Sequence, residues 1–280
     1  MAHASNPSNG STRLWRAPDV LDAVMLKGRF VRHRYPLHAH DTHCLALITS
    51  GSLVVNVAGH EALLRRGDIV SIDADTLHAG HAGPSGSWKM RVAHFHAEDL
   101  AAYTESVGLP VRSQFAVAAP VLRDATLAQW LYGISWCSEV NEDPFKRSET
   151  LAAAIGRLVA LHAAQPVQLG SPRLDSRVIR AVKEQLHAEL GAKLTLPALA
   201  AAHGVMPFTL LRAFVRSTGL SPHAYQQQVR IRYAHRRLRV GATPAVVAGE
   251  AGYADQAHFT RVFKQYTGVT PRAFQLAVMS

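Results

Sequence analysis

The sequence predicts an α+β protein of two domains: an N-terminal β-barrel with following helices, and an all-α C-terminal domain. Three observations predict this class. The chain has 280 residues, more than one typical domain needs. Residues 45–96 contain short β-branched runs punctuated by Gly and Asp. Near the C-terminus, "RAFVRSTG" (212–219) and "RVFKQYTG" (261–268) repeat one helical phrase 49 positions apart.

The N-terminal residues 1–19 are polar and lack the apolar segment of a secretory signal, so we expect them to be disordered. We expect one domain over residues 20–164. Gly51, Gly59 and Gly67 follow one another at eight-residue spacing, which is typical of tight turns in a meander or barrel. Apolar residues at helical spacing predict helices over 123–138 and 147–163. The Pro-, Gly- and Ser-containing segment 165–176 is the expected linker to a domain over 177–280.

Composition and charge indicate a cytoplasmic protein with a polyanionic partner. Cys44 and Cys137 are too few for a disulfide framework and are expected to be reduced thiols. No run of 18 apolar residues occurs, so no membrane partner is expected. Residues 171–280 contain 15 Lys and Arg against 5 Asp and Glu, whereas residues 1–170 contain 15 of each. The whole net charge of +10 therefore lies in the C-terminal part, which favours binding of a polyanion there.

Each copy of the repeated phrase predicts two helices joined by a glycine turn and continuing into a third helix. The first copy opens with Thr195 as N-cap and Pro197 in the first turn, and the second with Thr243 and Pro244. The same pattern predicts turns at His203-Gly204 and Gly252, and helix ends at Gly219 and Gly268. Further N-caps are expected at Asp255, Ser221-Pro222 and Thr270-Pro271. The apolar pairs Leu210/Phe214 and Phe259/Phe263 are expected to be buried.

Two helices joined in this way form a helix-turn-helix, whose second helix fits the major groove of DNA. The outward residues of the second copy are expected to be Gln256, Ala257, Thr260, Arg261 and Lys264. Gln and Arg pair with base edges, Ala and Thr meet a thymine methyl, and Lys suits a phosphate. A duplicated unit can place two such helices roughly 34 Å apart on one face of a duplex. The alternative is that these arginines are solvated charges on ordinary helices.

Residues 177–277 resemble the DNA-binding domain of the AraC/XylS family of bacterial transcription regulators. The second unit is matched by "AGYADQAHFTRVFKQYTGVTPRAF", the first by "LAAAHGVMPFTLLRAFVRSTGLSPHAY", and the long connecting helix by "QQQVRIRYAHRRLRVGATP". The resemblance implies base contacts from Phe208, Thr209 and Arg212 in the first unit, and from Gln256, Ala257, Thr260 and Arg261 in the second. Leu211 and Val215 depart from the polar residues common in such helices, so the first unit either reads bases by methyl contacts or mostly positions the protein.

Residues 20–100 resemble the cupin-like sensor domain often found in that family, through "PLHAHDTH", the strand series, "GD" and "HAG". His38 and His40 face the same side of a strand, and His78 is expected to join them across the barrel. Three interpretations stay open: an effector pocket, a divalent-metal site that lacks the glutamate usual in cupins, or histidines satisfied by local hydrogen bonds. Further pocket candidates of low specificity are His81, Trp88, His94 and His96.

These observations favour a sequence-specific transcription regulator, by family habit an activator, controlled by a small-molecule effector in the barrel. Arg236, Arg237 and Arg239, with Lys264, are expected to hold phosphates. The apolar stripes of the helices in 123–163 suit either a homodimer interface or packing onto the barrel, and the family resemblance favours a homodimer. We expect no catalytic residue, no cofactor and no enzyme activity. The alternatives are a metal-dependent cupin enzyme fused to a DNA-binding domain, which requires a full ligand set, and an architectural DNA-binding protein without an effector.

Overall fold

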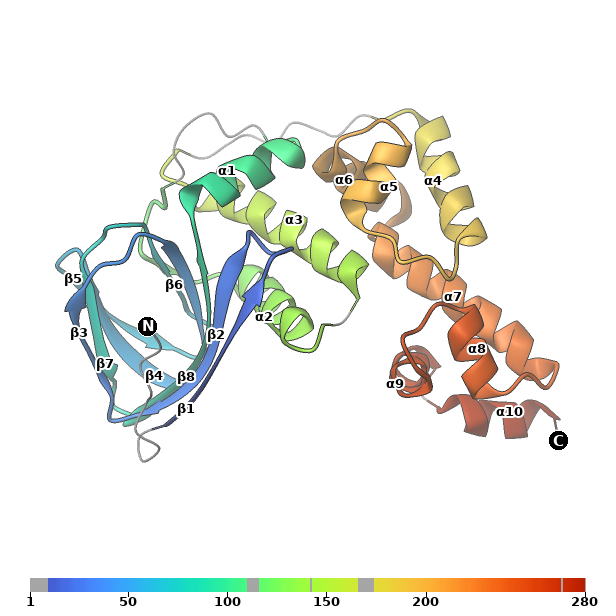
Figure 1. The fold of residues 1–280 in the computed structure, drawn as a ribbon, viewed down its shortest axis with the longest axis horizontal. Coiled ribbons are helices and arrows are strands. Elements are labelled where there is room, and N and C mark those ends of the chain that lie inside the picture. The colour runs from blue at the N-terminus through green and yellow to red at the C-terminus, as the bar shows by residue number, and fades with distance from the viewer. Residues whose placement is uncertain (1–9, 110–115, 142, 166–173, 268, 280) are drawn as a thin grey trace. The chain divides into compact units, whose positions relative to one another are not determined.

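The computed structural model describes residues 10–109, 116–141, 143–165, 174–267 and 269–279. The chain divides into two compact units. Unit 1 comprises Met1–Asp143 and Thr150–Ser171, and unit 2 comprises Pro144–Glu149 and Pro172–Ser280. All the strands that are described lie in unit 1, and unit 2 is helical (Figure 1). The predicted α+β class, with a strand-rich N-terminal part and a helical C-terminal part, is confirmed.

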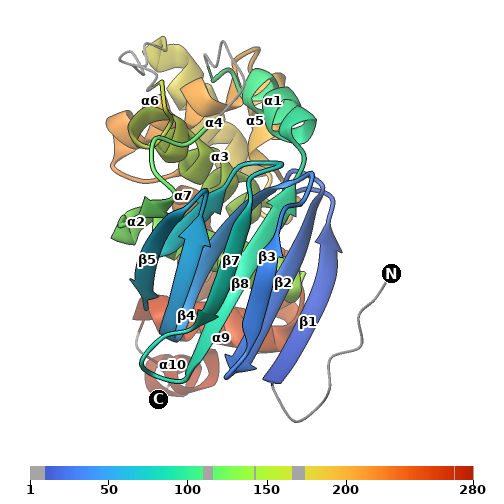
Figure 2. The same ribbon diagram turned by 90° about the vertical axis from the view of Figure 1, so that its left-hand side faces the viewer.

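Unit 1 is built on antiparallel strands that lie side by side in Figure 2. One path through the sheet runs β1 (Gly10–Ala17), β2 (Ala23–Val31), β8 (Ser87–Phe95), β4 (His43–Val57), β6 (Ile69–Ile72) and β9 (Val121–Leu122). Off this path, β7 (His78–Ala82) pairs with β3 (Arg34–His38) and β4, and β5 (His60–Arg65) pairs with β4. Large side chains such as Ile48, Leu64 and Trp88, each at most 1% exposed, form the core enclosed by these strands.

Strand β4 is shared by both parts of the sheet. Its first half pairs with β6 and β8, and its second half, from Ser52 to Val57, pairs with β5 and β7. The pairing with β8 shifts between Ile48 and Ser50, and Gly51 follows with φ +73°. A Cβ at Gly51 would collide with the carbonyl oxygen of Ser87, so only glycine fits. The tight turn predicted at Gly51 is therefore wrong, because the chain continues through it as a bulged strand.

The other two glycines of that series do lie in turns. Gly59 (φ +86°) lies between β4 and β5, and Gly67 (φ +96°) lies between β5 and β6. The predicted disorder does not hold for residues 10–17, which form edge strand β1 and pair with β2 along their whole length. Residues 1–9 lie outside the described part of the chain.

Three helices belong wholly or partly to unit 1: α1 (Ala97–Ser106), α2 (Ala125–Glu139) and α3 (Pro144–Leu161). The two predicted helices thus form within three residues of their expected ends. Asp124 caps α2 by accepting hydrogen bonds from the amides of Thr126 and Leu127, both at 3.1 Å. Most of the expected linker, residues 166–173, lies outside the described residues, and Asp175 at its end caps α4.

Unit 2 contains α4 (Ser176–Ala188), α5 (Leu196–Ala202), α6 (Pro207–Thr218), α7 (Pro222–Arg239), α8 (Pro244–Glu250), α9 (Gln256–Thr267) and α10 (Pro271–Met279). The predicted caps form: Thr195, Ser221, Thr243, Asp255 and Thr270 each accept a hydrogen bond from an amide three residues later. Gly204, Gly219 and Gly252 have positive φ, whereas Gly268 is outside the described residues. Both predicted apolar pairs, Leu210/Phe214 and Phe259/Phe263, are fully buried.

The long helix α7 connects the two helix-turn-helix units, α5–α6 and α8–α9 (Figure 1). Within the described part of the chain, no single helix is long and apolar enough to cross a membrane. The pair α5 and α6, bent by 89°, meets that requirement by length and composition only.

Candidate effector pocket and DNA-binding surface

The barrel of unit 1 contains a cavity of about 170 Å³. Its wall is mostly apolar, with residues such as Leu53, Val55 and Met90. Four imidazoles and one thiol give the cavity a polar side: His38, His40, Cys44, His78 and His94. The three histidines predicted to share a pocket therefore line one cavity, and His94, a low-specificity candidate, joins them.

Strand register explains why these side chains meet. His38 on β3 lies directly opposite His78 on β7, and Cys44 on β4 lies directly opposite His94 on β8. Residues in opposed positions project on the same face, so each pair points into the barrel. His40 connects the pairs: its ring centroid lies 4.8 Å from that of His78 and 4.9 Å from that of His94. The rings of His38 and His78 are 4.2 Å apart.

The protonation state of these rings follows from their hydrogen bonds. Nδ1 of His38, His40 and His78 lies 2.7–2.8 Å from the carbonyl oxygen of Pro36, Thr42 and Thr76, respectively. A carbonyl oxygen only accepts, so each Nδ1 must carry the proton and donate it. In the neutral ring the lone pair is then on Nε2. Hydrogen bonds to the main chain thus fix three imidazoles with an acceptor nitrogen left for a ligand.

Burial keeps the inner imidazoles neutral. Burial, together with the neighbouring rings of His38 and His40, lowers the pKa of His78 despite the opposing hydrogen bond to Thr76. Burial, with charge repulsion from the other rings, lowers the pKa of His94 to about 4. Burial also raises the pKa of the Cys44 thiol to about 12. At neutral pH His78 and His94 therefore present uncharged nitrogen lone pairs, and Cys44 presents a protonated thiol.

The nitrogen and sulfur atoms of the cavity bear on the second interpretation of the histidines, a divalent-metal site. Among the described residues, the ligand atoms of His40, Cys44 and His94 lie within 4.8 Å of one another, whereas the predicted set His38, His40 and His78 does not form such a group. Imidazole nitrogen and thiolate are ligands that zinc-type ions accept in three-coordinate protein sites with an open fourth position. The cluster expected from sequence is present, but the set with metal-ligand spacing differs from it.

The remaining pocket candidates, Trp88, His81 and His96, lie outside the cavity lining. Trp88 is 1% exposed and stacks on Phe30 with centroids 4.9 Å apart, which is a core position. His81 makes a 3.0 Å hydrogen bond between Nδ1 and the carbonyl of Ala82, and it is not among the residues lining the cavity. His96 is exposed at the N-terminus of α1, where its side chain makes no capping bond. None of the three lines the cavity.

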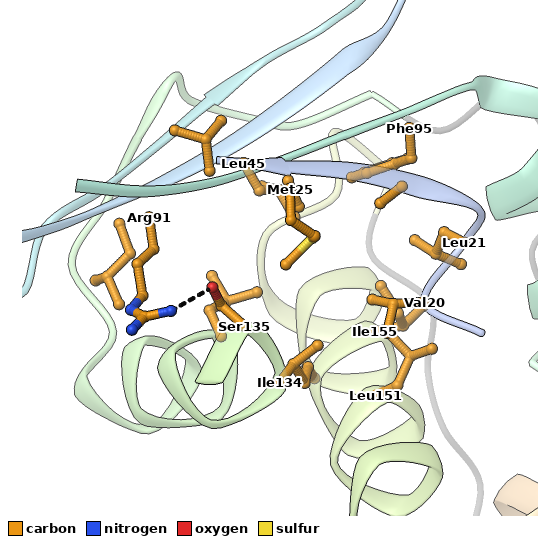
Figure 3. Close-up of a pocket in the computed structure, with 16 residues that line it drawn as sticks. Val20, Leu21, Met25, Leu45, Arg91, Phe95, Ile134, Ser135, Leu151 and Ile155 are labelled. Atoms are coloured by element: carbon orange, nitrogen blue, oxygen red, sulfur yellow. Dashed lines mark hydrogen bonds between the residues drawn. The ribbon is translucent and has the colours of Figure 1, made fainter. Parts of the chain in front are cut away.

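A second, smaller cavity of about 30 Å³ lies between the outer face of the sheet and helices α2 and α3 (Figure 3). Apolar side chains from strand and helix face one another across it, such as Met25, Phe95 and Ile155. At one end Arg91, 6% exposed, donates to Ser135 Oγ at 3.0 Å and to Glu139 at 2.8 Å. This volume is close to that of a single water, so the contact is a packing interface rather than a ligand site.

In unit 2, the outward face of α9 carries the predicted DNA-binding residues. Gln256, Ala257, Arg261 and Lys264 are exposed and Thr260 is half-buried, while Phe259 and Phe263 hold the opposite face in the core. At helical spacing, this face presents the amide of Gln256, the methyl groups of Ala257 and Thr260 with the Thr260 hydroxyl, and the cationic groups of Arg261 and Lys264. It thus offers both base-edge and phosphate contacts.

The first recognition helix, α6, differs from this arrangement. Phe208 and Leu211 are each only 6% exposed, so neither is available to a base in this structure. The base contact implied for Phe208 therefore does not fit its position. The guanidinium of Arg212 lies 5.6 Å above the Phe208 ring, which supports the arginine from below. Thr209 and Arg212 remain partly exposed, and Arg216, which sequence reasoning did not single out, is exposed one turn further along.

Among the three arginines expected to hold phosphates, Arg237 has a different partner. It donates two hydrogen bonds of 2.8 Å to Glu250 on α8, and the Tyr233 hydroxyl donates to the same carboxylate. The hydrogen bonds from Arg237 lower the pKa of Glu250. Arg237 thus connects α7 to α8. Arg236 and Arg239 are exposed.

The two helix-turn-helix units are held against each other by buried polar contacts that the sequence did not reveal. Arg230 on α7, 5% exposed, donates to the carbonyl of Leu190 at 2.9 Å and stacks 5.6 Å above Tyr253. The Tyr253 hydroxyl donates to Gln227 on α7 at 3.1 Å. The turn at Gly252 touches the same loop, because a Cβ there would lie 2.6 Å from the Cα of Gly191. These contacts fix how one recognition helix is placed relative to the other.

The first turns of α3 also belong to unit 2. Ser148 Oγ accepts a hydrogen bond from the amide of Leu196 at the start of α5, at 2.9 Å. The Glu149 carboxylate, 5% exposed, accepts from the amide of His223 in the first turn of α7. Phe145, 2% exposed, packs edge-on against the His223 ring. A six-residue segment far away in sequence thus completes the N-termini of two helices.

A barrel with a ligand-sized cavity, joined to two helix-turn-helix units on one connecting helix, defines a ligand-binding transcription regulator. Residues 21–155 match the AraC-like ligand binding domain, and residues 199–277 match a helix-turn-helix domain. The chain belongs to the AraC family of transcription regulators, and its architecture agrees with the resemblance found in its sequence.

Three relatives match over most of their length. The chain is 25% identical over 242 residues to the uncharacterized HTH-type transcriptional regulator YbfI of Bacillus subtilis, covering 85% of each chain. It is 25% identical over 260 residues to the MmsAB operon regulatory protein of Pseudomonas aeruginosa, covering 88% of this chain and 79% of the relative. It is 24% identical over 277 residues to the HTH-type transcriptional activator RhaR of Pectobacterium atrosepticum, covering 91% and 90%.

Proposed function

We propose that this regulator acts as a homodimeric transcription activator whose operator is read by α9 and α6 and whose effector occupies the barrel cavity. The observation that carries the DNA-reading role is the exposed face of α9, opposite a fully buried apolar face. Gln256 and Arg261 suit base edges, Ala257 and Thr260 suit a thymine methyl, and Lys264 suits a phosphate. Activation is supported by the relative RhaR, which is named an activator.

In the first unit the proposed readers are Thr209 and Arg212, with Arg216 as a phosphate contact. All three keep solvent access, in contrast to Phe208 and Leu211. Because Phe208 and Leu211 occupy the positions that correspond to Ala257 and Thr260 in the second copy, the first unit offers fewer base-directed groups. We therefore assign the stricter sequence preference to the second unit.

The effector must be small, since the cavity measures about 170 Å³. The neutral imidazoles of His78 and His94 present acceptor nitrogens, so the effector carries hydrogen-bond donors or positive charge rather than carboxylates. Effector control requires that the effector binds two arrangements of the regulator with different affinity. The homodimer is proposed because two copies bind repeated half-sites more tightly than one.

Substitution in α9 tests the DNA-reading role. Arg261→Ala should weaken operator binding by about 1–3 kcal/mol and relax the preference at one base pair. Lys264→Ala should weaken binding to all sequences alike and reduce the salt dependence by about one phosphate contact. Arg272→Ala on α10 removes an exposed arginine outside the recognition helix and serves as the charge-matched control. Binding to an operator library scored at several salt concentrations separates the three, and an unchanged preference in Arg261→Ala would contradict the assignment.

A further inference from the structure

The polar side of the barrel cavity presents imidazole nitrogens to its interior. His40 and His78 each donate Nδ1–H to a main-chain carbonyl, so that Nε2 is the acceptor nitrogen of the neutral ring. His94 lies beside them with its Nδ1 3.4 Å from the Thr42 hydroxyl. Such nitrogens can bind a hydrogen-bond donor or a cation in the space between them.

Cys44 adds a different kind of ligand to this group. It is 6% exposed, faces the cavity, and lies directly opposite His94 in the β4–β8 pairing. A cross-strand pair fixes the thiol and the imidazole on one face of a sheet. His40, which follows strand β3, approaches the same pair, and the ligand atoms of the three residues lie within 4.8 Å of one another.

A second set of contacts holds two of these ligands. Thr42 accepts from His40 Nδ1 through its carbonyl at 2.7 Å, and its hydroxyl lies 3.3 Å from the same nitrogen and 3.4 Å from His94 Nδ1. In metal-binding histidines, the ring nitrogen that does not coordinate the metal makes a hydrogen bond of this kind. The hydrogen bond orients the ring and fixes the tautomer. One residue thus positions both imidazoles toward the thiol.

We propose that the barrel binds one divalent transition-metal ion, of the Zn²⁺ and Co²⁺ class, through His40, Cys44 and His94. The inference rests on the proposed function only in taking the barrel as the ligand-binding part of the regulator. Two imidazoles and one sulfur favour borderline ions such as these over Mg²⁺ or Ca²⁺, which prefer oxygen ligands. Binding converts the Cys44 thiol to a metal-bound thiolate and releases its proton to solvent, so one proton leaves for each ion bound.

The proposed site leaves a fourth coordination position open. His78 is the nearest further imidazole, with its ring 4.8 Å from that of His40, and the cavity of about 170 Å³ adjoins it. A tetrahedral ion held by three protein ligands accepts a fourth ligand from either source.

Cobalt spectroscopy on the untagged full-length chain tests this site. After chelation and reloading with Co²⁺, the wild type should bind one ion per chain and show a thiolate-to-cobalt charge-transfer band with the visible bands of a four-coordinate ion. Cys44→Ser should lose the charge-transfer band and bind at least about 100-fold more weakly. Cys137→Ser removes the other buried cysteine, on α2, and should leave both readouts unchanged.

Two histidine variants keep the test decisive if Cys44→Ser does not fold. His94→Gln should weaken Co²⁺ binding to a similar degree while retaining the barrel's circular dichroism. His60→Gln, an exposed histidine on β5, should have no effect. Absence of Co²⁺ binding by the wild type, or binding without a sulfur band, would overturn the proposal. Operator binding is measured separately on metal-free protein, so failure of the DNA-reading role and failure of the metal site are distinguishable.

Discussion

Replacement of Gly252 by alanine tests how the two helix-turn-helix units are joined. Gly252 has φ +75°, a conformation that costs an L-residue roughly 1–2 kcal/mol. A Cβ there would also lie 2.6 Å from the Cα of Gly191 and 2.9 Å from the carbonyl oxygen of Leu190. Both neighbours are backbone atoms, and Arg230 holds the Leu190 carbonyl in place. Overpacking of this kind adds roughly 1–3 kcal/mol, so we expect a total destabilisation of about 2–5 kcal/mol.

Gly219→Ala is the matched control, because Gly219 has the same φ of +75° but nothing within 4 Å of the added Cβ. It should cost only the backbone component of about 1–2 kcal/mol. All four tryptophans, at 15, 88, 130 and 136, lie in unit 1, so fluorescence does not follow unit 2. Hydrogen exchange in the full chain gives the local free energy of opening, from α8 and α9 peptides for Gly252→Ala and from α6 and α7 peptides for Gly219→Ala. Equal destabilisation by the two substitutions would refute the close approach between the turn and the loop.

Two further predictions concern buried carboxylates. Burial would raise the pKa of Asp124, but hydrogen bonds from Arg157 at 2.6 Å and His162 at 2.8 Å outweigh it and lower the pKa. Asp124→Asn should therefore destabilise unit 1 by about 1–3 kcal/mol at neutral pH. The difference should shrink below about pH 4, where the Asp124 carboxylate takes up a proton in the unfolded chain while its lowered pKa keeps it ionised in the folded chain. A pH-independent difference in the tryptophan-monitored urea midpoint would contradict this. Glu149→Gln should destabilise α7 by about 0.5–2 kcal/mol in hydrogen exchange, because it removes the charge at that helix N-terminus. Glu184→Gln, on the exposed face of α4, should have no measurable effect, and an equal effect of the two would reject the capping role.

Local signals made unit 2 predictable. Thr195, Ser221, Thr243 and Asp255 each lie just before a helix, and capping depends only on residues within one turn. The duplicated phrase then doubled the evidence for each helix. The packing of Arg230 and the contribution of α3 were not predictable, because they depend on which distant segments meet and leave no periodic pattern.

The errors in unit 1 have the same origin. Gly51 has the positive φ expected of a turn glycine, but the chain needs it for a bulge where β4 passes from one set of partners to another. The strand β1 is polar and mostly exposed, so it lacks the alternation by which strands are recognised. Histidine spacing placed His38, His40 and His78 together, yet only the register of β4 against β8 brings His94 to Cys44.

The burial of Phe208 limits what the sequence repeat can predict about exposed residues. Its counterpart in the second copy, Ala257, is exposed, and one larger apolar side chain is sufficient to turn an exposed position into a packing position. Similar sequence predicted the same backbone in both copies. It did not predict the same contact surface.

The central claim is that two recognition helices of one chain contact DNA in successive major grooves. The direct measurement is methylation protection of guanine N7 on a duplex selected by the full-length protein from a random pool. Within each half-site we expect two protected patches about one helical turn apart, roughly 34 Å, with Arg261→Ala exposing one patch and Arg212→Ala exposing the other. Selection of no preferred sequence, or a single patch that both substitutions expose alike, would contradict the account.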